Sequence, residues 1–598
     1  MCGINGIFAY HGAAAPVKPT EVRSTRDYMA RRGPDDSGEF YAWDMRIGFG
    51  HRRLTIIDLS DRGAQPMKSR DGRYVITFNG EIYNFRELRR ELEASGVEFC
   101  SESDTEVLLN LYAAKGEAML QDLRGMFAFA IWDAARENLF LARDCYGIKP
   151  LYYNDDGRTF RFASQVKALL AGGGVSREPD PAGAVGFHLF GSVPEPFTSY
   201  LNIRALQAGA ALLLNSRGST IRRHHSIAEI YSRAQSSKPA EPVDVREALR
   251  ESVRRHLVAD VPVGAFLSSG IDSGALVGLM RDVGAIDIKT ITVGFNEFLG
   301  WPEDETRLAA EVAKTYGAKH TTRFVSRAEF EADLPKIFEA MDQPSIDGVN
   351  GWFVSKAARE LGLKVAISGL GGDELFGGYP SFSDLPRWSR FFSLPSQIPF
   401  LGSTARTLMV PMTSAFGLSP KAAGMLEYGG SYPGAYLLRR GLFMPWELGS
   451  VLDQETVKLG MQRLSPLQLI GAEFGGLPLQ DRARVAVLES SFYMRNQLLR
   501  DIDWASMAHS LEVRTPLVDC TLLASLAASG GPHKSDLAAA PAIALPSVVT
   551  NRLKTGFSIP IDAWMGRLVE DKGKGHARPQ SAYRAWARFV WKNSVGAS

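Results

Sequence analysis

The second residue, Cys2, stands where it could act as an amino-terminal nucleophile. An initiator methionine is generally removed when the next residue is small, which would leave a thiol and a free amine together on Cys2. The amine has an ordinary pKa of about 7.7 to 8.0 and the thiol one of about 8.5, so at neutral pH part of the amine can accept the thiol proton. Cys2 would then supply both nucleophile and base. The alternative is a small buried cysteine without a chemical role.

Two loops rich in glycine and serine could bind phosphate. The stretch VPVGAFLSSGIDSGAL, Val261 to Leu276, places a Ser/Gly loop between an apolar strand and a helix. Backbone N–H groups and the helix N-terminus would converge there on an anion, which we expect to be pyrophosphate. The second loop, SGLGGDELFGGY, Ser368 to Tyr379, also follows a strand-like run, and no GxxxxGKS or GxxxxGKT motif indicates a P-loop kinase. The alternative for both loops is an ordinary turn.

The composition indicates a globular chain with more than one domain. A single core rarely organises 598 residues, so two domains are expected. Apolar residues make up 45% and charged residues 22%, which excludes a disordered or fibrous chain. The formal charge is +2 without a basic block, so we expect small-molecule partners and no nucleic acid. Neither a run of about eighteen apolar residues nor a signal peptide is evident, which predicts a cytoplasmic protein without membrane association.

The spacing of the cysteines bears on metal binding and on redox state. The four cysteines, Cys2, Cys100, Cys145 and Cys520, lie far apart and form no CxxC. This spacing predicts neither a zinc site nor a disulfide framework, and it fits a reducing compartment.

A polar stretch from Tyr231 to Pro242 predicts a linker between two unequal parts. Before it, short β-rich runs dominate, of which Tyr74 to Phe78 predicts a strand and Asn79-Gly80 a tight turn. A helix is expected next, with Asn84 as its cap and Gly96 as its stop. We therefore expect an α+β fold for the first part.

Beyond the linker, apolar strand-like runs alternate with helical patterns, and the pattern becomes largely helical from about Arg482. Such alternation predicts an α/β fold with a parallel sheet and crossover helices. The alternating segments are Val261 to Leu267, Ser273 to Met280, Ile288 to Phe295, Asp304 to Tyr316 and Lys364 to Ser368.

Seven motifs of the first part resemble, in residue type and in order, class II glutamine amidotransferases of the asparagine synthetase family. They are MCGINGIF, RRGPDDSG, GHRRLTIID, NGEIYN, SDTE, GMFAFAIWD and ARDCYGIKPLYY. In the second part, the loop after Val261 resembles the SGGxDS loop of ATP pyrophosphatases, and DIDWASMAHSLEVRTPLVD and RLKTGFSIPIDAW complete the family pattern. The resemblance implies a glutaminase domain with an Ntn-hydrolase αββα sandwich over residues 2–230 and a linker over 231–242. It further implies an ATP pyrophosphatase domain over 243–598, with a parallel sheet and additional helices.

The resemblance implies roles in glutamine hydrolysis. Cys2 attacks the side-chain amide of glutamine, which releases ammonia and leaves a thioester for water to hydrolyse. The other implied residues are an oxyanion hole of Asn79 and the Gly80 N–H, Arg53 for the α-carboxylate, and Glu81 and Asp104 for the α-ammonium. Taken singly, Asn79-Gly80 could be a plain turn and Asp104 could simply start a helix after Ser103.

The same resemblance implies ATP and Mg²⁺ as cofactors of the second part. Asp272 and Asp373 are the expected magnesium ligands, and Lys554 is the expected catalytic lysine that stabilises charge during adenylation and amidation. Alone, Lys554 beside Arg552 would pass for a solvated surface charge. The expected ATP-binding residues are Leu267, Ser268, Ser269, Gly270, Asp272, Ser273, Val293, Ser368 and Gly369.

Three positions depart from the family pattern. Ser269 replaces a usual glycine, which reduces the backbone freedom of the pyrophosphate loop. Leu370 replaces the glutamate that asparagine synthetases commonly carry and that is tied to forming and amidating β-aspartyl-AMP. A leucine can neither take a proton nor pair with an ammonium, and Glu374 is a candidate substitute. Gln165 stands where the family often has glutamate.

We therefore predict a glutamine-dependent, ATP-consuming amidotransferase in which ammonia travels inside the protein to a carboxylate activated with AMP. The leading acceptor is L-aspartate, which would give asparagine, AMP and pyrophosphate. Leu370 motivates a different carboxylate, such as a uronic acid, a natural-product acid or a peptide. A catalytically degenerate scaffold or binding protein is the other alternative, against which Cys2, Asp272, Asp373 and Lys554 weigh. The resemblance also carries the expectation of a homodimer.

Overall fold

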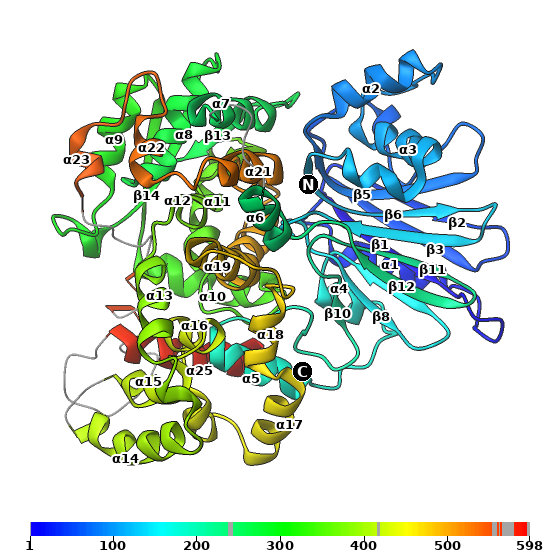
Figure 1. Cartoon of the computed structure of the whole chain (residues 1–598). Helices are drawn as coiled ribbons and strands as arrows, with labels where there is room; N and C mark the ends of the chain where they lie inside the picture. Colours follow the sequence, from blue (N-terminus) through cyan, green and yellow to red (C-terminus); the bar gives the residue numbers. More distant parts are fainter. Residues whose placement is uncertain are drawn as a thin grey trace.

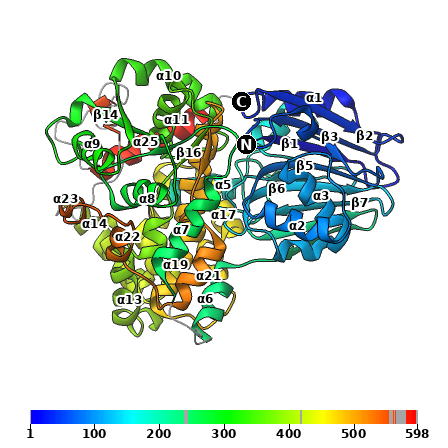
Figure 2. The ribbon, with the colours of Figure 1, turned by 90° about the horizontal axis from the view of Figure 1, so that it is seen from above.

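The chain folds into two parts that lie side by side (Figures 1 and 2). A computed structural model describes residues 2–236, 243–415, 419–552, 559–560, 563–564 and 579–594. Two antiparallel sheets from the first part occupy one side of the molecule, and a parallel sheet with many helices occupies the other. The N-terminus lies at the boundary between the two parts in both views.

The first part is an αββα sandwich, as predicted. One six-stranded sheet has the order β10-β8-β9-β1-β3-β2 and the other β12-β11-β7-β6-β5-β4. Apolar side chains of the two sheets meet in one core, where Phe8 contacts Trp132. The strands are β1 (Gly3–Phe8), β2 (Asp36–Tyr41), β3 (Ile47–Arg53), β4 (Met67–Lys68), β5 (Tyr74–Ile82), β6 (Gly125–Asp133), β7 (Asn138–Arg143), β8 (Tyr152–Asp155), β9 (Phe160–Ala163), β10 (Arg204–Ala205), β11 (Ala210–Asn215) and β12 (Gly218–Arg223).

Helices cover the outer faces of both sheets. Helices α1 (Pro19–Tyr28) and α4 (Val166–Ala171) pack on the sheet that contains β1. Helices α2 (Phe85–Ala94) and α3 (Asp104–Lys115) pack on the sheet that contains β5. Each helix buries one apolar stripe against its sheet, which is why four layers form.

Two local predictions around β5 are wrong. Asn79 and Gly80 form no tight turn, because β5 continues through them and pairs them with β6. A side chain at Gly80 would place its Cβ 2.1 Å from the Met126 carbonyl oxygen, so this close strand pairing requires glycine. Asn84 does not cap α2 with its side chain, which instead donates to the Asp122 carbonyl. Tertiary partners override the local turn and cap preferences at both places.

The second part contains the predicted parallel sheet, in the order β15-β14-β13-β16-β17. Its strands are β13 (Val263–Phe266), β14 (Lys289–Phe295), β15 (Lys319–Val325), β16 (Val365–Ile367) and β17 (Glu512–Arg514). The connecting helices are α8 (Ile271–Asp282), α9 (Thr306–Thr315), α10 (Arg327–Ala340) and α11 (Val349–Glu360). Since helices lie on both faces, the strands can be apolar along most of their length.

The remaining chain is helical, as predicted from about Arg482 onward. The helices after β16 are α12 (Gly372–Phe376), α13 (Ser381–Phe391), α14 (Leu401–Ala415), α15 (Met425–Tyr428), α16 (Tyr432–Arg440), α17 (Gln454–Leu464), α18 (Pro466–Ala472), α19 (Asp481–Leu488), α20 (Arg500–Met507), α21 (Cys520–Ala528), α22 (Lys534–Ala539), α23 (Ser547–Thr550) and α25 (Pro579–Ser594). Between α19 and α20 the segment η7 (Glu489–Leu499) is a π-helix. Such helices are rare and occur often at functional sites.

Two helices connect the parts in ways that the sequence did not indicate. Helix α5 (Pro181–Phe190) precedes the expected linker but packs against α17 and beside the red helix α25, where Phe187 stacks on Trp591 (Figure 1). The expected linker begins inside α6 (Ile227–Ser236), which packs on α21, and its residues 237–242 lie outside the described ranges. Helix α7 (Val245–His256) follows.

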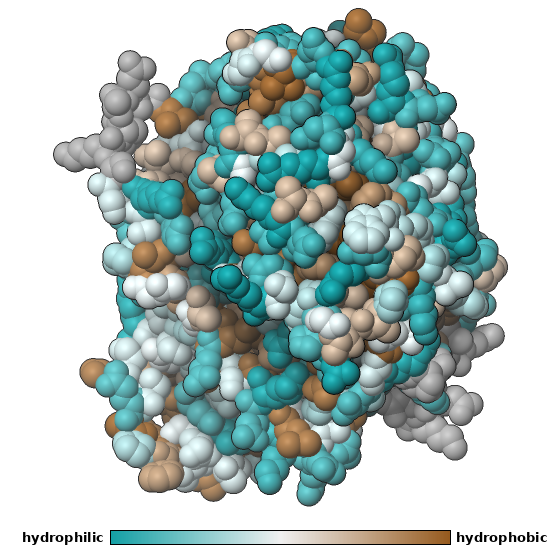
Figure 3. Space-filling model, turned by 90° about the vertical axis from the view of Figure 1, so that its right-hand side faces the viewer, coloured by the Kyte–Doolittle hydropathy of each residue, from teal (hydrophilic) through white to brown (hydrophobic). Residues whose placement is uncertain are grey.

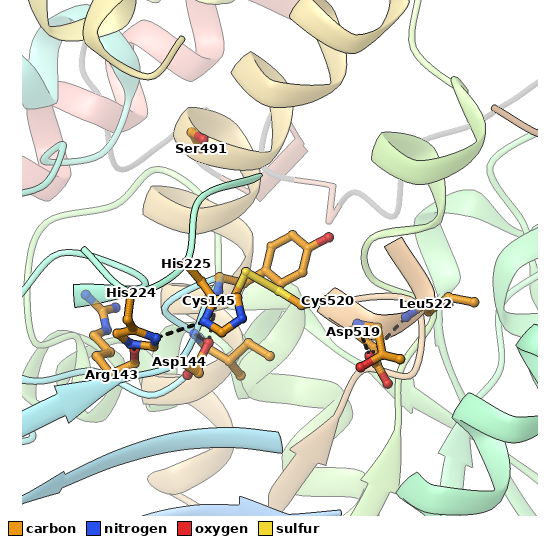
Figure 4. Close-up of a disulfide and its surroundings, with 12 residues drawn as sticks. Arg143, Asp144, Cys145, His224, His225, Ser491, Asp519, Cys520 and Leu522 are labelled. Atoms are coloured by element: carbon orange, nitrogen blue, oxygen red, sulfur yellow. Dashed lines mark hydrogen bonds between the residues drawn. A yellow bond between two sulfur atoms is a disulfide. The ribbon is translucent and has the colours of Figure 1, made fainter. Parts of the chain in front are cut away.

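The predicted absence of a disulfide is wrong. Cys145, which follows β7, is bonded to Cys520 at the start of α21, 375 residues later (Figure 4). Asp519 caps α21 by accepting hydrogen bonds from its first N–H groups. Sequence spacing could not show this pair, because the bond joins the two parts of the fold. Cys2 is buried and unpaired, and Cys100 is exposed and unpaired.

No helix within the described ranges combines the length and the apolar character that crossing a bilayer requires. On the face formed by the first part, hydrophobic side chains are mostly interspersed with hydrophilic ones (Figure 3). The homodimer stays a prediction.

The disulfide gives a first testable prediction. Digestion of the unreduced protein should yield one linked peptide pair that contains Cys145 and Cys520, and a thiol reagent should label Cys100 first because it is exposed. Reduction, or Cys145→Ser, should lower the melting temperature, since loss of a native disulfide typically costs about 2–5 kcal/mol. Cys100→Ser is the matched control and should melt as the parent does. Labelling of both Cys145 and Cys520 in native, unreduced protein would contradict the pairing.

Candidate active sites

The first candidate site surrounds Cys2, at the boundary between the two parts. Cys2 immediately precedes β1, and only 8% of its surface is exposed. Its backbone nitrogen donates a hydrogen bond of 2.9 Å to Oδ1 of Asn79 on β5. Burial raises the pKa of the Cys2 thiol, and the Leu54 N–H and the charge of Arg53 act against that rise. The predicted nucleophile and the predicted oxyanion residue are therefore in direct contact.

Asn79 has an amide group ready for a ligand. Its side chain is fully buried, and its Nδ2 has no hydrogen-bond partner among the described residues. A buried donor without a partner is costly, so its presence in a fold points to a ligand that accepts the hydrogen bond. Gly80, the other predicted oxyanion residue, follows Asn79 on β5.

The predicted glutamine-binding side chains gather around this point. Arg53, at the end of β3, is held by the backbone carbonyls of Asp58 and Ser60. Asp104 is the first residue of α3, in agreement with the alternative that it starts a helix after Ser103. Its carboxylate also accepts a hydrogen bond of 3.1 Å from the Ile82 N–H. Burial raises the pKa of Asp104 to about 6. The structural role and the proposed binding role of Asp104 are compatible.

Two residues of β17 reach the candidate glutamine site, and the sequence analysis missed both. Arg514 is fully buried, and its Nη2 lies 3.3 Å from Oε1 of Glu81. Its Nε donates to Oε1 of Glu512 at 2.6 Å. Burial and the nearby Glu512 raise the pKa of Glu81, whereas the positive charges around Glu512, Arg514 among them, hold the pKa of Glu512 at about 2 despite burial. The motif SLEVRTP was recognised, but only the fold shows that it crosses into the other part.

A second candidate site is a cavity of about 800 Å³ at the carboxyl ends of the parallel strands. Ligands bind at this edge of open α/β sheets. All predicted ATP-binding and magnesium residues with described positions line the cavity, namely Leu267, Ser268, Ser269, Gly270, Asp272, Ser273, Val293, Ser368, Gly369 and Asp373. A Cβ on Gly369 would lie 2.9 Å from the Ser273 nitrogen, so the two loops touch. Lys554 lies outside the described residues.

The two predicted magnesium ligands converge on one lysine that the sequence analysis missed. Nζ of Lys534, at the start of α22, lies 2.9 Å from Oδ1 of Asp373 and donates to Asp272 as well. Two carboxylates from the first turns of separate helices, α8 and α12, suit Mg²⁺, which typically takes one or two carboxylates and completes its shell with water and substrate phosphate. No group of three or more His, Cys, Asp or Glu is arranged for a metal ion in the described ranges, so phosphate oxygens would have to supply the rest.

Glu374, the candidate substitute for the glutamate replaced by Leu370, lines the same cavity but has another partner. Only 3% of it is exposed, and its Oε1 accepts a hydrogen bond from the Tyr379 hydroxyl at 3.0 Å. Burial, and then the charge of Asp373, raise the pKa of Glu374 to about 8. Leu370 is half-buried and lines the cavity next to Gly369. Gln165 precedes α4, whose first N–H groups donate to Asp342 of the second part.

Comparison with known proteins agrees with this two-site arrangement. A family model described as a glutamine amidotransferase domain matches residues 1–225, and one described as asparagine synthase matches residues 244–584. Glutamine-hydrolyzing asparagine synthetase 1 of Bacillus subtilis is 33% identical, over 94% of this chain and 88% of its own length. Glutamine-hydrolyzing asparagine synthetase 3 of the same organism is 30% identical, over 88% of this chain and 80% of its own length. Amidase chry2 of Gibberella zeae is 31% identical, over 64% of this chain and 60% of its own length.

The raised pKa of Glu374 predicts how stability depends on pH. Between about pH 5 and pH 8 the folded chain holds this proton and the unfolded chain does not, so stability should fall as the pH rises, by up to about 1.4 kcal/mol per pH unit. Glu374→Gln keeps an acceptor for Tyr379 and cannot ionise. Its melting temperature should exceed that of the parent at pH 7.5, and the difference should shrink toward pH 5. The exposed Glu303→Gln is the control. A difference that stays constant from pH 5 to 8.5 would refute the assignment.

Proposed function

We propose that this chain, which belongs to the glutamine-hydrolysing asparagine synthetase family, transfers ammonia from glutamine to a carboxylate activated with ATP. The observation that carries the glutaminase half is the contact of Cys2 with Asn79, whose Nδ2 has no hydrogen-bond partner within the part of the chain that the structure describes. The observation that carries the synthetase half is the convergence of Asp272 and Asp373 in the cavity at the strand ends.

Glutamine hydrolysis follows from the first site. Once Cys2 is terminal, its amine takes the thiol proton, and the sulfur attacks the side-chain carbonyl carbon of glutamine. The oxyanion that forms would accept hydrogen bonds from Asn79 Nδ2 and the Gly80 N–H, and donors of this kind are each worth about 10²–10³ in rate. Ammonia then leaves with a proton, and water hydrolyses the thioester to glutamate. Burial keeps the released ammonia out of bulk water, where it would be protonated.

The charged groups of this site would orient glutamine. Arg53 would bind the α-carboxylate, and Glu81 and Asp104 the α-ammonium. In the structure burial raises the pKa of both carboxyl groups, and a bound ammonium would favour their ionised forms again. Binding of glutamine and ionisation of the site would thus be coupled.

The second site would make the acyl-adenylate. The acceptor carboxylate oxygen attacks the α-phosphorus of ATP, the bond to the bridging oxygen of the β-phosphate breaks, and pyrophosphate leaves. Ammonia then attacks the acyl carbon, AMP leaves, and a proton is released. The N–H groups at the start of α8 and the Lys534 ammonium would bind pyrophosphate. Asp272 and Asp373 would hold Mg²⁺, which neutralises phosphate charge when bound. Lys554 would stabilise charge on the acyl-phosphate.

Two acceptors follow from different observations. The names of the curated relatives favour L-aspartate, which would yield asparagine, AMP and pyrophosphate. Leu370 favours a different carboxylate, because a leucine at the cavity wall can neither move a proton nor pair with an α-ammonium.

Replacement of the nucleophile tests the division of labour. Cys2→Ala should abolish glutamine hydrolysis and glutamine-dependent pyrophosphate release, yet leave ammonia-dependent release within about twofold, because only the nitrogen supply is damaged. Glutamate and pyrophosphate are measured separately. Cys100→Ala, an exposed free cysteine, is the matched control and should change neither. Equal loss with both nitrogen sources would refute separate sites.

Replacement of a magnesium ligand tests the other half. Asp272→Asn should lower pyrophosphate release at least 100-fold with either nitrogen source, because the phosphate charge would no longer be neutralised, and glutamine hydrolysis should persist. Asp287→Asn, an exposed acid of the same part that pairs with Lys319, should behave as the parent. Pyrophosphate release at the parental rate by Asp272→Asn would show that the metal assignment is wrong.

A further inference from the structure

We infer that the acceptor of this enzyme is a carboxylic acid with an aromatic body and no α-ammonium group. The inference rests on the proposed function and concerns the part of the cavity beyond the nucleotide loops. Five aromatic side chains line that part of the cavity: Phe190, Tyr379, Tyr436, Phe492 and Tyr493. They come from α5, the loop after α12, α16 and the π-helix η7.

Together these rings form an aromatic wall of two contacting groups, one around Phe492 and one of Tyr379 with Tyr493. Phe492 lies 5.8 Å from Phe190 and 5.9 Å from Tyr436, measured between ring centroids. Tyr379 and Tyr493 meet edge to face at 5.9 Å. Such separations are those of interacting aromatic pairs, and a further ring can join them by the same offset or edge contacts.

Arg440 fixes two of the rings and does not offer a free charge to the acceptor. Its guanidinium lies 3.8 Å from the centroid of Tyr493 and 4.5 Å from that of Tyr379. It also binds Glu489, which is completely buried, at 2.8 Å. The buried ion pair satisfies the cation, so Arg440 serves to hold the aromatic wall in place.

Several polar groups beside the wall are already hydrogen-bonded, which disfavours a sugar acid. Oδ1 of Asn496 accepts from the Glu195 N–H, and its Nδ2 donates to the Ser491 carbonyl. Gln497 donates to Asp347, and the Tyr379 hydroxyl donates to Glu374. A uronic acid carries several hydroxyls that need partners, whereas an aromatic ring needs none.

The acidic groups of the cavity are also poorly placed to hold an α-ammonium. Asp272 and Asp373 contact Lys534. The other acids of the cavity already accept hydrogen bonds from protein groups. Asp347 accepts from the Gly348 N–H, Glu374 from the Tyr379 hydroxyl, and Asp501 from the Ser345 hydroxyl and the Trp504 indole. An amino-acid acceptor needs an anionic partner, and the position next to Gly369 that could supply one holds Leu370.

The arrangement of the sheet places the acceptor body against this wall. Phosphates would lie at β13 and α8, and Val293 on β14 lies on the side of β13 away from β16. The aromatic wall lies on the side of α12, which follows β16. A carboxylate that meets the α-phosphate at Ser368 and Gly369 would therefore extend away from the adenine toward Leu370 and the rings.

Carboxylate-dependent exchange of labelled pyrophosphate into ATP tests the inference in the full-length protein. The probes are 3-phenylpropanoate, L-aspartate and D-glucuronate. We expect kcat/KM for 3-phenylpropanoate to exceed the other two at least tenfold. Tyr493→Ala should raise the KM for 3-phenylpropanoate at least tenfold with little change in kcat, and Tyr493→Phe should restore it because the ring is kept. Tyr28→Ala, on the far helix α1, is the matched control.

Each other result overturns the inference in a distinguishable way. Exchange that is highest with L-aspartate or with D-glucuronate would refute the aromatic acceptor and leave the proposed function intact. Exchange with no acid, while glutamine is still hydrolysed, would overturn the ATP-dependent half of the proposed function and the acceptor with it. An unchanged KM in a folded Tyr493→Ala variant, verified by its melting temperature, would show that the wall does not contact the acceptor.

Discussion

The two parts of the molecule depend on one buried arginine, Arg514. Its side chain binds Glu512 and approaches Glu81 at the proposed glutamine site. Its Nη1 donates to the carbonyl of His256, the last residue of α7, and to that of Val258 just after the helix. Its own carbonyl accepts from the Ser368 N–H at 2.9 Å, within the second phosphate loop. A buried guanidinium is tolerated only where such partners surround it, so the strand that carries Arg514 must lie where both sites meet.

The position of Cys2 obeys the same constraint. Arg32 donates to the Cys2 carbonyl at 3.1 Å and makes a bidentate pair with Asp503 of α20, so the residue that positions the nucleophile is itself held by the second part. Neither part alone supplies this arrangement. A chain end buried at the boundary lies beside the part that would consume ammonia, which suits a reagent that water would protonate.

Sequence patterns predicted the elements well where local and tertiary preferences agree. The strand runs at Val261, Ile288 and Lys364 became β13, β14 and β16, because buried parallel strands are apolar throughout. Asn79-Gly80 has the residue types of a turn, yet pairing with β6 keeps it extended. Lys534 and the Cys145–Cys520 bond were out of reach, since each depends on contacts between segments hundreds of residues apart. The final helix α25 was missed as well, although Trp586 on it is completely buried.

The difference between local patterns and contacts of distant segments also explains why the motifs predict the reaction better than the acceptor. Phosphate chemistry is placed by the ends of β13 and β16, where a loop and a helix N-terminus must follow a buried strand, and such segments leave a clear pattern. The acceptor wall is assembled from α5, the loop after α12, α16 and η7, which belong to both parts of the chain. Its rings can change without disturbing the sheet edge. Leu370 and Tyr379 lie both within a motif and at this cavity, so they are positions through which the sequence could report on the acceptor.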